Sequence, residues 1–281
     1  MPGFSAADVA ALRKATGAGM MDCKQALQES DGDMEAAKDW LRSKGLAGAS
    51  KRAGRSAEQG AVEVVVDGTV GALVELTCET DFVAKGADFT ALAGQLARQV
   101  AEQGDNDVEQ QSFEGGTVGD AIKSLGAKVG ENVGLGRVAR YEADDGLVDG
   151  YKHVQNERGT IGVLVELSGL DAADAKAREI AHDVALHVAS AAPRYTTRED
   201  VPDDVVAKER SVLEELTRNE GKPEQALPKI VEGRLNAFYK DVVLVEQPFI
   251  RDPKTTVQKL LGELGGSATV RRFERVKIGE E

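Results

Sequence analysis

The residues best suited to chemistry in this chain are two cysteines and three histidines. Cys78 lies close to Glu79 and Asp81 but has no adjacent base, and neighbouring carboxylates tend to raise the pKa of a thiol rather than lower it. The histidines are His153, His182 and His187. The last two are five residues apart, so on a helix they would be separated by about 140° and would not share a metal ion. We therefore expect neither a nucleophilic cysteine nor a metal site.

Other patterns typical of enzymes are also weak. Gly130, Gly134 and Gly136 form neither a dinucleotide-binding fingerprint nor a phosphate-binding loop, and they precede a predicted strand rather than open a helix. The many carboxylates form no recognisable catalytic pair. We therefore expect no cofactor and no enzymatic activity.

The composition favours a protein whose partner is another protein. The formal net charge of −13 argues against a broad nucleic-acid-binding surface, which would need an excess of basic residues. Cys23 and Cys78 lie far apart and form no Cys-x-x-Cys pair, so nothing supports a disulfide framework. The sequence contains neither a signal-peptide pattern nor an apolar run of membrane-spanning length. We expect a cytoplasmic protein that contacts no membrane and binds no nucleic acid directly.

A duplicated segment points to a site of a different kind. Gly68–Thr77 recurs as Gly159–Ser168, identical at seven of ten positions and displaced by 91 residues. The apolar stripe of the following helix recurs at a displacement of only 88 residues, as Leu92, Leu96 and Val100 and then Ile180, Val184 and Val188. Three extra residues therefore lie between strand and helix in the first copy, within Cys78–Gly86. Because functional residues concentrate in loops on a rigid scaffold, we expect function in this loop.

The first 45 residues predict a small domain of three short helices. Ser5–Asp8 has the spacing of a helix-capping box, and Gly17 can end the first helix. Apolar residues at helical spacing predict a second helix around Cys23 and a third around Trp40, which should end near Gly45.

The basic segment 46–60 has few residues to bury, so we expect a linker there, with or without a helical part. It leads to a duplicated α+β core. The first half, 61–145, opens with a hairpin signalled by Asp67-Gly68 between β-rich runs, and the second half, 146–281, repeats its order. We expect two small antiparallel sheets, each with helices on one face. The predicted strands and helices are Val62–Val66, Thr69–Leu76, Phe89–Glu102, Val118–Val129, Val133–Tyr141, Leu147–His153, Thr160–Leu167, a helix around Ile180, and Thr269–Val276.

An insertion in the second half, at about 200–240, predicts an antiparallel coiled-coil hairpin. The apolar residues of its first helix are Val205, Val206, Val212, Leu213 and Leu216. After a turn at Gly221–Pro223, a second apolar stripe could pack against them. The second stripe is Leu227, Ile230, Val231, Leu235 and Phe238. Pro228 would cost about 3 kcal/mol inside a helix, so the second helix should start late or kink.

Two further segments carry a family resemblance. Arg13–Leu27 and Thr80–Lys85 closely resemble the two signature motifs of bacterial translation elongation factor Ts. The likeness continues through Lys128–Val133, Tyr151–His153 and Glu232–Arg234 and covers nearly the whole chain. The resemblance implies a guanine nucleotide exchange factor for the GTPase elongation factor Tu. It also implies a ubiquitin-associated-like N-terminal domain, a duplicated core and a coiled-coil hairpin.

The resemblance also implies which residues contact the partner. Asp81 and Phe82 would be inserted into the nucleotide domain of elongation factor Tu, near its magnesium-binding region. Of Met20 and Met21, we expect one to pack inside the small domain and the other to meet the partner. The remaining implied contacts are Leu12, Thr80, Val83, Lys85, Val129, Gly130 and His153.

The sequence is compatible with more than one role for Phe82 and more than one class of protein. Phe82 could pack only on its own helix, and a non-catalytic adaptor, whose binding ignores the nucleotide, is the main rival to an exchange factor. Some family members continue past the last core strand into a helix that contacts the partner, whereas this chain stops at Glu281, so we expect that contact to be missing or replaced. The complex could contain one or two copies of each protein.

Overall fold

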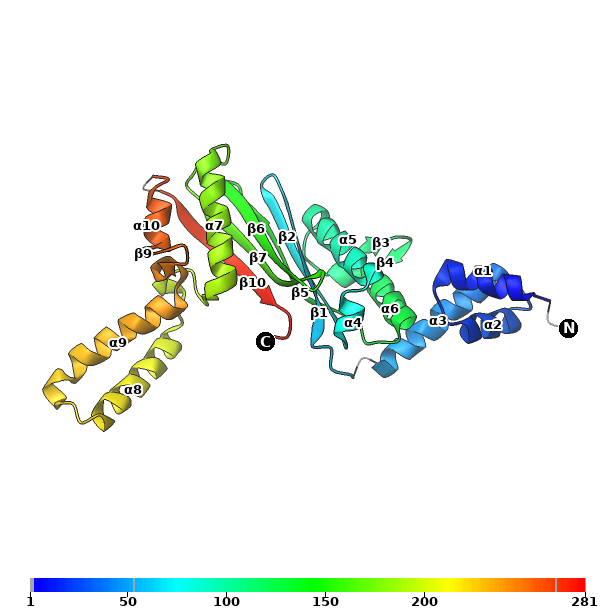
Figure 1. Cartoon of the computed structure of the whole chain (residues 1–281), viewed down its shortest axis with the longest axis horizontal. Coiled ribbons are helices and arrows are strands. Elements are labelled where there is room, and N and C mark those ends of the chain that lie inside the picture. The colour runs from blue at the N-terminus through cyan, green and yellow to red at the C-terminus, as the bar shows by residue number, and fades with distance from the viewer. Residues whose placement is uncertain (1–2, 53, 266, 281) are drawn as a thin grey trace.

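The computed structural model describes residues 3–52, 54–265 and 267–280, arranged as an elongated molecule (Figure 1). A helical domain lies at the N-terminal end, two sheets with their helices form the middle, and a pair of helices projects at the far end. The expected mixture of an N-terminal helical region and small antiparallel sheets is therefore confirmed. Within the described ranges, every helix is too short or too polar to cross a membrane.

The N-terminal domain has three helices, as predicted. They are α1 (Ala6–Thr16), α2 (Met20–Glu29) and α3 (Met34–Arg52). The expected capping box is present: the Asp8 amide donates to Ser5 Oγ, and the Ser5 amide donates to the Asp8 carboxylate at 2.7 Å. Gly17 ends α1 in the left-handed conformation, with φ at 68°. Leu12 and Leu27 are fully buried in the small core of the domain.

The third helix is longer than the sequence predicts. α3 continues past Gly45, its expected end, and stops at Arg52, inside the segment 46–60 expected to be a linker. Gly45 lies against α6 (Val118–Val129), where an added Cβ would be 3.1 Å from the Cβ of Ala127. The missing side chain at this glycine allows α3 to pack closely on α6 instead of ending the helix.

The first half of the core is a three-stranded antiparallel sheet in the order β1-β2-β5, with helices on one face. Its strands are β1 (Gln59–Asp67), β2 (Val70–Cys78) and β5 (Gly134–Glu142), and the expected hairpin joins the first two. The helices are α4 (Asp81–Ala84), α5 (Ala87–Gln103) and α6. A short 3₁₀ turn (Val108–Gln110) and the small strands β3 (Ser112–Phe113) and β4 (Gly116–Thr117) connect α5 to α6.

The second half repeats this plan. Its sheet has the order β10-β7-β6, with β6 (Gly146–Gln155), β7 (Arg158–Ser168) and β10 (Thr269–Lys277), and α7 (Ala175–Ala191) covers one face. A 3₁₀ turn (Arg198–Asp200) follows α7, and after the helical insertion four short elements lead to β10. These are the 3₁₀ turn Leu244–Glu246, β8 (Pro248–Phe249), β9 (Asp252–Thr256) and α10 (Val257–Gly262).

The two sheets pack against each other through their helix-free faces. Leu73 and Leu164 are fully buried in a cluster to which both sheets contribute. A Cβ added at Gly71 would lie 3.0 Å from Leu164 Cδ2, and one added at Gly162 would lie 3.0 Å from Leu73 Cδ1. Gly71 and Gly162 occupy the same position of the duplicated segment, and so do the two leucines. The contact is thus reciprocal: each half supplies a glycine for the leucine of the other.

The helical insertion only partly follows the sequence pattern. α8 (Asp203–Asn219) and α9 (Leu227–Val242) lie side by side, but Val212 and Leu216 of the predicted seam are exposed to solvent. That part of the seam is wrong, because Thr217 is buried instead and accepts a hydrogen bond from Arg234 Nη1 at 3.2 Å. The late start of the second helix is confirmed, since Pro228 lies in the first turn of α9.

We predict that Gly162→Ala lowers the free energy of unfolding by about 1–3 kcal/mol, because the new methyl group would clash with Val62 and Leu73 across the sheet interface. Urea unfolding measures the change. Gly233→Ala in α9 is the matched control, since nothing lies within 4 Å of its added Cβ and alanine favours a helix. Equal stability of the two variants would contradict the packing role of Gly162.

Candidate functional site

The loop with the extra residues folds into a single helical turn that presents an aromatic ring to solvent. Thr80 caps this turn, α4, by accepting a hydrogen bond from the Val83 amide, and Ala84 is buried against the core. Phe82 is 80% exposed, the highest value among the exposed large hydrophobic side chains of the described residues. The ring therefore does not pack into its own domain, and the loop holds it outward.

The charged neighbours of this ring form a local pair. Lys85 Nζ lies 2.8 Å from Asp81 Oδ2 and 5.0 Å from the centre of the Phe82 ring. The hydrogen bond from Lys85 is the main reason why the pKa of Asp81 lies below its ordinary value, with a smaller contribution from the charge of Arg158. Asp81 is therefore ionised at neutral pH, beside an exposed ring.

One carboxylate fixes the start of the loop. Glu131, just beyond the end of α6, accepts hydrogen bonds from the Glu79 amide at 3.1 Å, the Thr80 amide at 3.0 Å and Thr80 Oγ1 at 2.6 Å. The Glu79 carboxylate in turn accepts a hydrogen bond from the backbone amide of Asn132, the residue after Glu131, at 2.6 Å. These bonds join the loop to the turn between α6 and β5. Glu131 lies in the family segment Lys128–Val133, but its sequence alone indicates no role for it.

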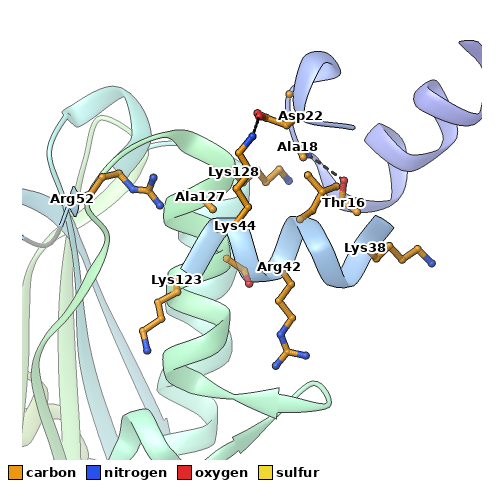
Figure 2. Close-up of a pocket in the computed structure, with 14 residues that line it drawn as sticks. Thr16, Ala18, Asp22, Lys38, Arg42, Lys44, Arg52, Lys123, Ala127 and Lys128 are labelled. Carbon is orange, nitrogen blue, oxygen red and sulfur yellow. Dashed lines mark hydrogen bonds and ion pairs between the residues drawn. The ribbon is translucent and has the colours of Figure 1, made fainter. Parts of the chain in front are cut away.

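The end of α6 also joins the N-terminal domain to the core. The Lys128 side chain lies over Gly17, where an added Cβ would be 2.6 Å from Lys128 Cε, and Lys128 Nζ pairs with Asp88 at 2.8 Å. Figure 2 shows Lys128 reaching from α6 toward Thr16 and the turn that follows α1. The cleft between α6, α3 and this turn has a volume of about 530 Å³. The family segments containing Gly17, Lys128 and Thr80 thus come together around the end of one helix.

Arg158 brings the second half of the core toward the same loop. Its guanidinium donates to the Gly60 carbonyl at 2.8 Å and to Gln59 Oε1 at 2.9 Å, at the start of β1. Arg158 opens β7 directly after the β6–β7 turn, and its charge contributes to the lowered pKa of Asp81. Arg158 could not be found from the sequence, because nothing in its local sequence indicates that the turn approaches the first half of the core.

The comparisons with known proteins agree with these family segments. The family model described as "Elongation factor TS" matches residues 79–280. A relative named "Elongation factor Ts" from Micrococcus luteus is 48% identical over 284 residues, which covers 99% of this chain and all of the relative. Relatives of the same name from Streptomyces avermitilis and Mycobacterium avium are 50% and 49% identical over 287 residues, and all of each relative is covered.

The chain belongs to the elongation factor Ts family.

In this family member, the contacts implied for the N-terminal domain differ in accessibility. Met20 and Met21 on α2 are 57% and 72% exposed, so the expectation that one of them packs inside is wrong. Leu12 is fully buried, so its side chain supports the domain and offers no surface to a partner in this conformation. Both methionines are long and flexible, and together they form an exposed apolar patch.

The other implied contacts lie near the loop or on the second sheet. Gly130 ends α6 in the left-handed conformation, exposed and with open space around it, while Val129 is half-buried against the core. His153 is exposed on β6, and its Nδ1 lies 3.1 Å from the hydroxyl of Tyr151, a hydrogen-bonding distance. Val83 is half-buried against the first sheet and its helices.

The residues considered for catalysis serve structural roles. Cys78 is buried, and its Sγ lies 3.2 Å from the Thr80 carbonyl oxygen. Burial, followed by the charge of Glu131, raises the pKa of the Cys78 thiol to about 12. His187 is buried between Gln247 and the Ile250 amide, and burial lowers its pKa. In the part of the chain that the structure describes, no group of three His, Cys, Asp or Glu residues could hold a metal ion.

We predict that Glu131→Ala loosens the loop, because the Glu79 and Thr80 amides lose their acceptor. The free energy of unfolding should fall by about 1–3 kcal/mol, and these two amides should exchange with deuterium at least about tenfold faster. Hydrogen exchange read by NMR measures the second effect. Glu102→Ala, at an exposed position near the end of α5, is the control. Unchanged exchange at Thr80 would contradict the role of Glu131.

We also predict that the Cys78 thiol resists alkylation by iodoacetamide at pH 8, because it is buried and protonated. Unfolding in urea should restore the reaction, as mass spectrometry can show. The folded thiol keeps its proton above the ordinary pKa of 9.0, so its contribution to stability is complete below pH 9 and is lost as the pH rises toward 12. Rapid alkylation of Cys78 in the folded protein would contradict this and would revive a nucleophilic role.

Proposed function

We propose that this protein is a guanine nucleotide exchange factor for the GTPase elongation factor Tu, and that Phe82 and Asp81 enter the nucleotide domain of that partner. The observation that carries the proposal is the exposed Phe82 ring on a loop that is three residues longer than its counterpart in the second half. Membership of the elongation factor Ts family supports the partner and the role in translation elongation.

The geometry of the loop suits insertion into a pocket. An aromatic ring that moves from water into a partner gains roughly 1.5–3 kcal/mol, and aromatic anchors dominate many interfaces. The cap at Thr80 and the three hydrogen bonds to Glu131 hold the loop in place before binding. Less conformational entropy is then lost on association, so more of the burial energy appears as affinity.

Asp81 would weaken the binding of the nucleotide to the partner. Its carboxylate is ionised and is paired with Lys85 in the free protein. On binding, a carboxylate placed near the Mg²⁺ and phosphates of the bound nucleotide would repel the phosphates and compete for the polar groups that hold them. Lys85 lies on the same face and can remain paired with Asp81 or turn to the partner.

Exchange then follows from reciprocal binding. If the factor prefers the nucleotide-free partner, nucleotide and factor weaken each other's affinity by the same ratio, and no covalent bond changes. A shift of 10⁴ between two states needs about 5.5 kcal/mol of differential binding, which exceeds what one phenylalanine supplies. We therefore assign further contacts to Met20, Met21, Val129, Gly130 and His153, which spread the interface over the N-terminal domain and both core halves.

We also propose how the chain is divided into domains and where the protein acts. We assign a ubiquitin-associated-like fold to residues 1–45 and coiled-coil character to the helical hairpin at about 200–240, between core halves at 61–145 and 146–281. The protein acts in the cytoplasm with the translation machinery, without direct contact to nucleic acid or membrane. One or two copies of each protein form the complex.

We predict that Phe82→Ala slows the stimulated release of GDP from elongation factor Tu by roughly 10- to 150-fold while leaving the free energy of unfolding nearly unchanged, because the ring is exposed in the free protein. Release of a fluorescent GDP analogue measures the rate. Val212→Ala, which removes an exposed apolar side chain from α8, is the matched control and should exchange normally.

An unchanged rate in folded Phe82→Ala would overturn the assignment of the loop. Binding that is indifferent to added GDP would overturn the exchange function itself and favour the adaptor.

A further inference from the structure

A groove rich in arginine lies along β10 in the second half of the core, with one lining residue, Arg137, supplied by β5 of the first half. It runs between β10 and the segment that follows α7, and its volume is about 500 Å³. Five arginines line it: Arg137, Arg194, Arg271, Arg272 and Arg275. In a chain with a net charge of −13, such a concentration of guanidinium groups is unusual and calls for a physical explanation.

The floor of the groove is an open sheet edge. β10 pairs with β7 on one side and has no strand on the other among the described residues. A bulge between Val270 and Arg272 shifts its register, so that two consecutive side chains reach the same carboxylate of β7 instead of pointing to opposite faces. Arg271 Nη1 lies 2.9 Å from Glu166, and Arg272 Nε lies 2.6 Å from it.

The charges in the groove do not balance. Glu166 is 1% exposed and is shared by two arginines, both about half exposed on their outer sides. Arg275 pairs with Glu280 at 2.8 Å. Arg194 has no carboxylate within 4 Å among the described residues, and its guanidinium lies over the ring of Tyr195.

Three carboxylates line the groove, Asp200, Glu274 and Glu280, so they offset only three of its five arginines. Asp200 accepts hydrogen bonds from the amide and hydroxyl of Thr197, the residue that caps the short 3₁₀ turn Arg198–Asp200. Glu274 is half-buried, and burial raises its pKa. Arg137 donates to two backbone carbonyls, those of Arg275 and Glu280, and lies 3.9 Å from Glu75. Guanidinium groups with free donors therefore remain on both walls of the groove, Arg194 on one and Arg271 on the other.

We propose that this groove binds an extended acidic peptide segment of another protein, which adds to β10 as a fourth strand and places its carboxylates against Arg194 and Arg271. The edge supplies backbone donors and acceptors for strand addition, and the Arg275 carbonyl becomes one of them once the peptide displaces Arg137, which donates to it at 3.5 Å. Planar guanidinium groups bind carboxylates with two parallel hydrogen bonds, which gives the groove its preference for acidic side chains. A second copy of this chain is a poor occupant, because pairing β10 with itself would set arginine beside arginine.

The test uses the full chain and a fluorescein-labelled ten-residue peptide of alternating Glu and Thr, with binding followed by fluorescence anisotropy. The wild type should bind this peptide at least about tenfold more tightly than a peptide of alternating Lys and Thr. The double variant Arg194→Gln/Arg271→Gln should weaken binding by about tenfold or more; it leaves Arg272 on the buried Glu166, so the fold is retained. The matched control, Lys208→Gln/Lys229→Gln, removes the same charge from exposed positions on α8 and α9 and should bind as the wild type does.

A second arm separates strand addition from simple attraction of anions. The same acidic peptide, N-methylated at alternate residues on the edge that faces β10, keeps its charge but loses its backbone donors and should bind at least about tenfold more weakly. Equal binding of the methylated peptide, or equally tight binding of inorganic pyrophosphate, would overturn strand addition. Equal losses in the groove and control variants, or no binding to the wild type, would overturn the site and leave the arginines as residues that only protect an open edge from self-association.

Discussion

The reciprocal contact between Gly71 and Leu164 and between Gly162 and Leu73 determines how the rest of the molecule is arranged. It brings the helix-free faces of the two sheets together, so each sheet buries one face on the other and the opposite face under helices. Glycine is needed because a Cβ at either position would clash with a valine of the opposing sheet, Val148 or Val62, and press on the opposing leucine. The close approach also sets the β6–β7 turn beside the start of β1, where Arg158 reaches two residues that flank the loop of Phe82. A site assembled from both halves therefore depends on a packing contact in the interior.

Two glutamates at equivalent positions of the duplicated segment have different roles in the two halves. Glu75 and Glu166 occupy equivalent positions on the central strands, and in both halves the neighbouring strand bulges opposite the carboxylate. Glu75 accepts a hydrogen bond from the backbone amide of Arg137 at 3.0 Å, so it completes the ladder that the bulge interrupts. Glu166 instead binds the side chains of Arg271 and Arg272. The shared backbone irregularity is thus structural in the first half, whereas in the second half it collects positive charge at the surface.

Local signals in the sequence were sufficient for much of the fold and for locating the loop of the candidate site. The capping box at Ser5, the hairpin at Asp67-Gly68 and the bounds of α6 follow from interactions within a few residues, and the extra residues around Phe82 were visible from the duplication alone. Predictions that depended on partners distant in sequence failed. α3 passes through Gly45 because α6 packs there, and α8 turns Thr217 toward α9 because Arg234 provides its hydrogen bond. Glu131 and Arg158 could not be assigned for the same reason, since their roles exist only once the chain is folded.

The unexpected length of α3 has a mechanical consequence. A helix of 19 residues is about 28 Å long, and this one runs from the N-terminal domain onto α6 without a flexible break before Arg52. A continuous helix, rather than a flexible linker, therefore connects the domain that carries the exposed methionines to the core. This constrains the distance between these methionines and the Phe82 ring. A partner that engages both apolar surfaces must present two pockets with a matching separation, so α3 would limit which partners can bind both surfaces.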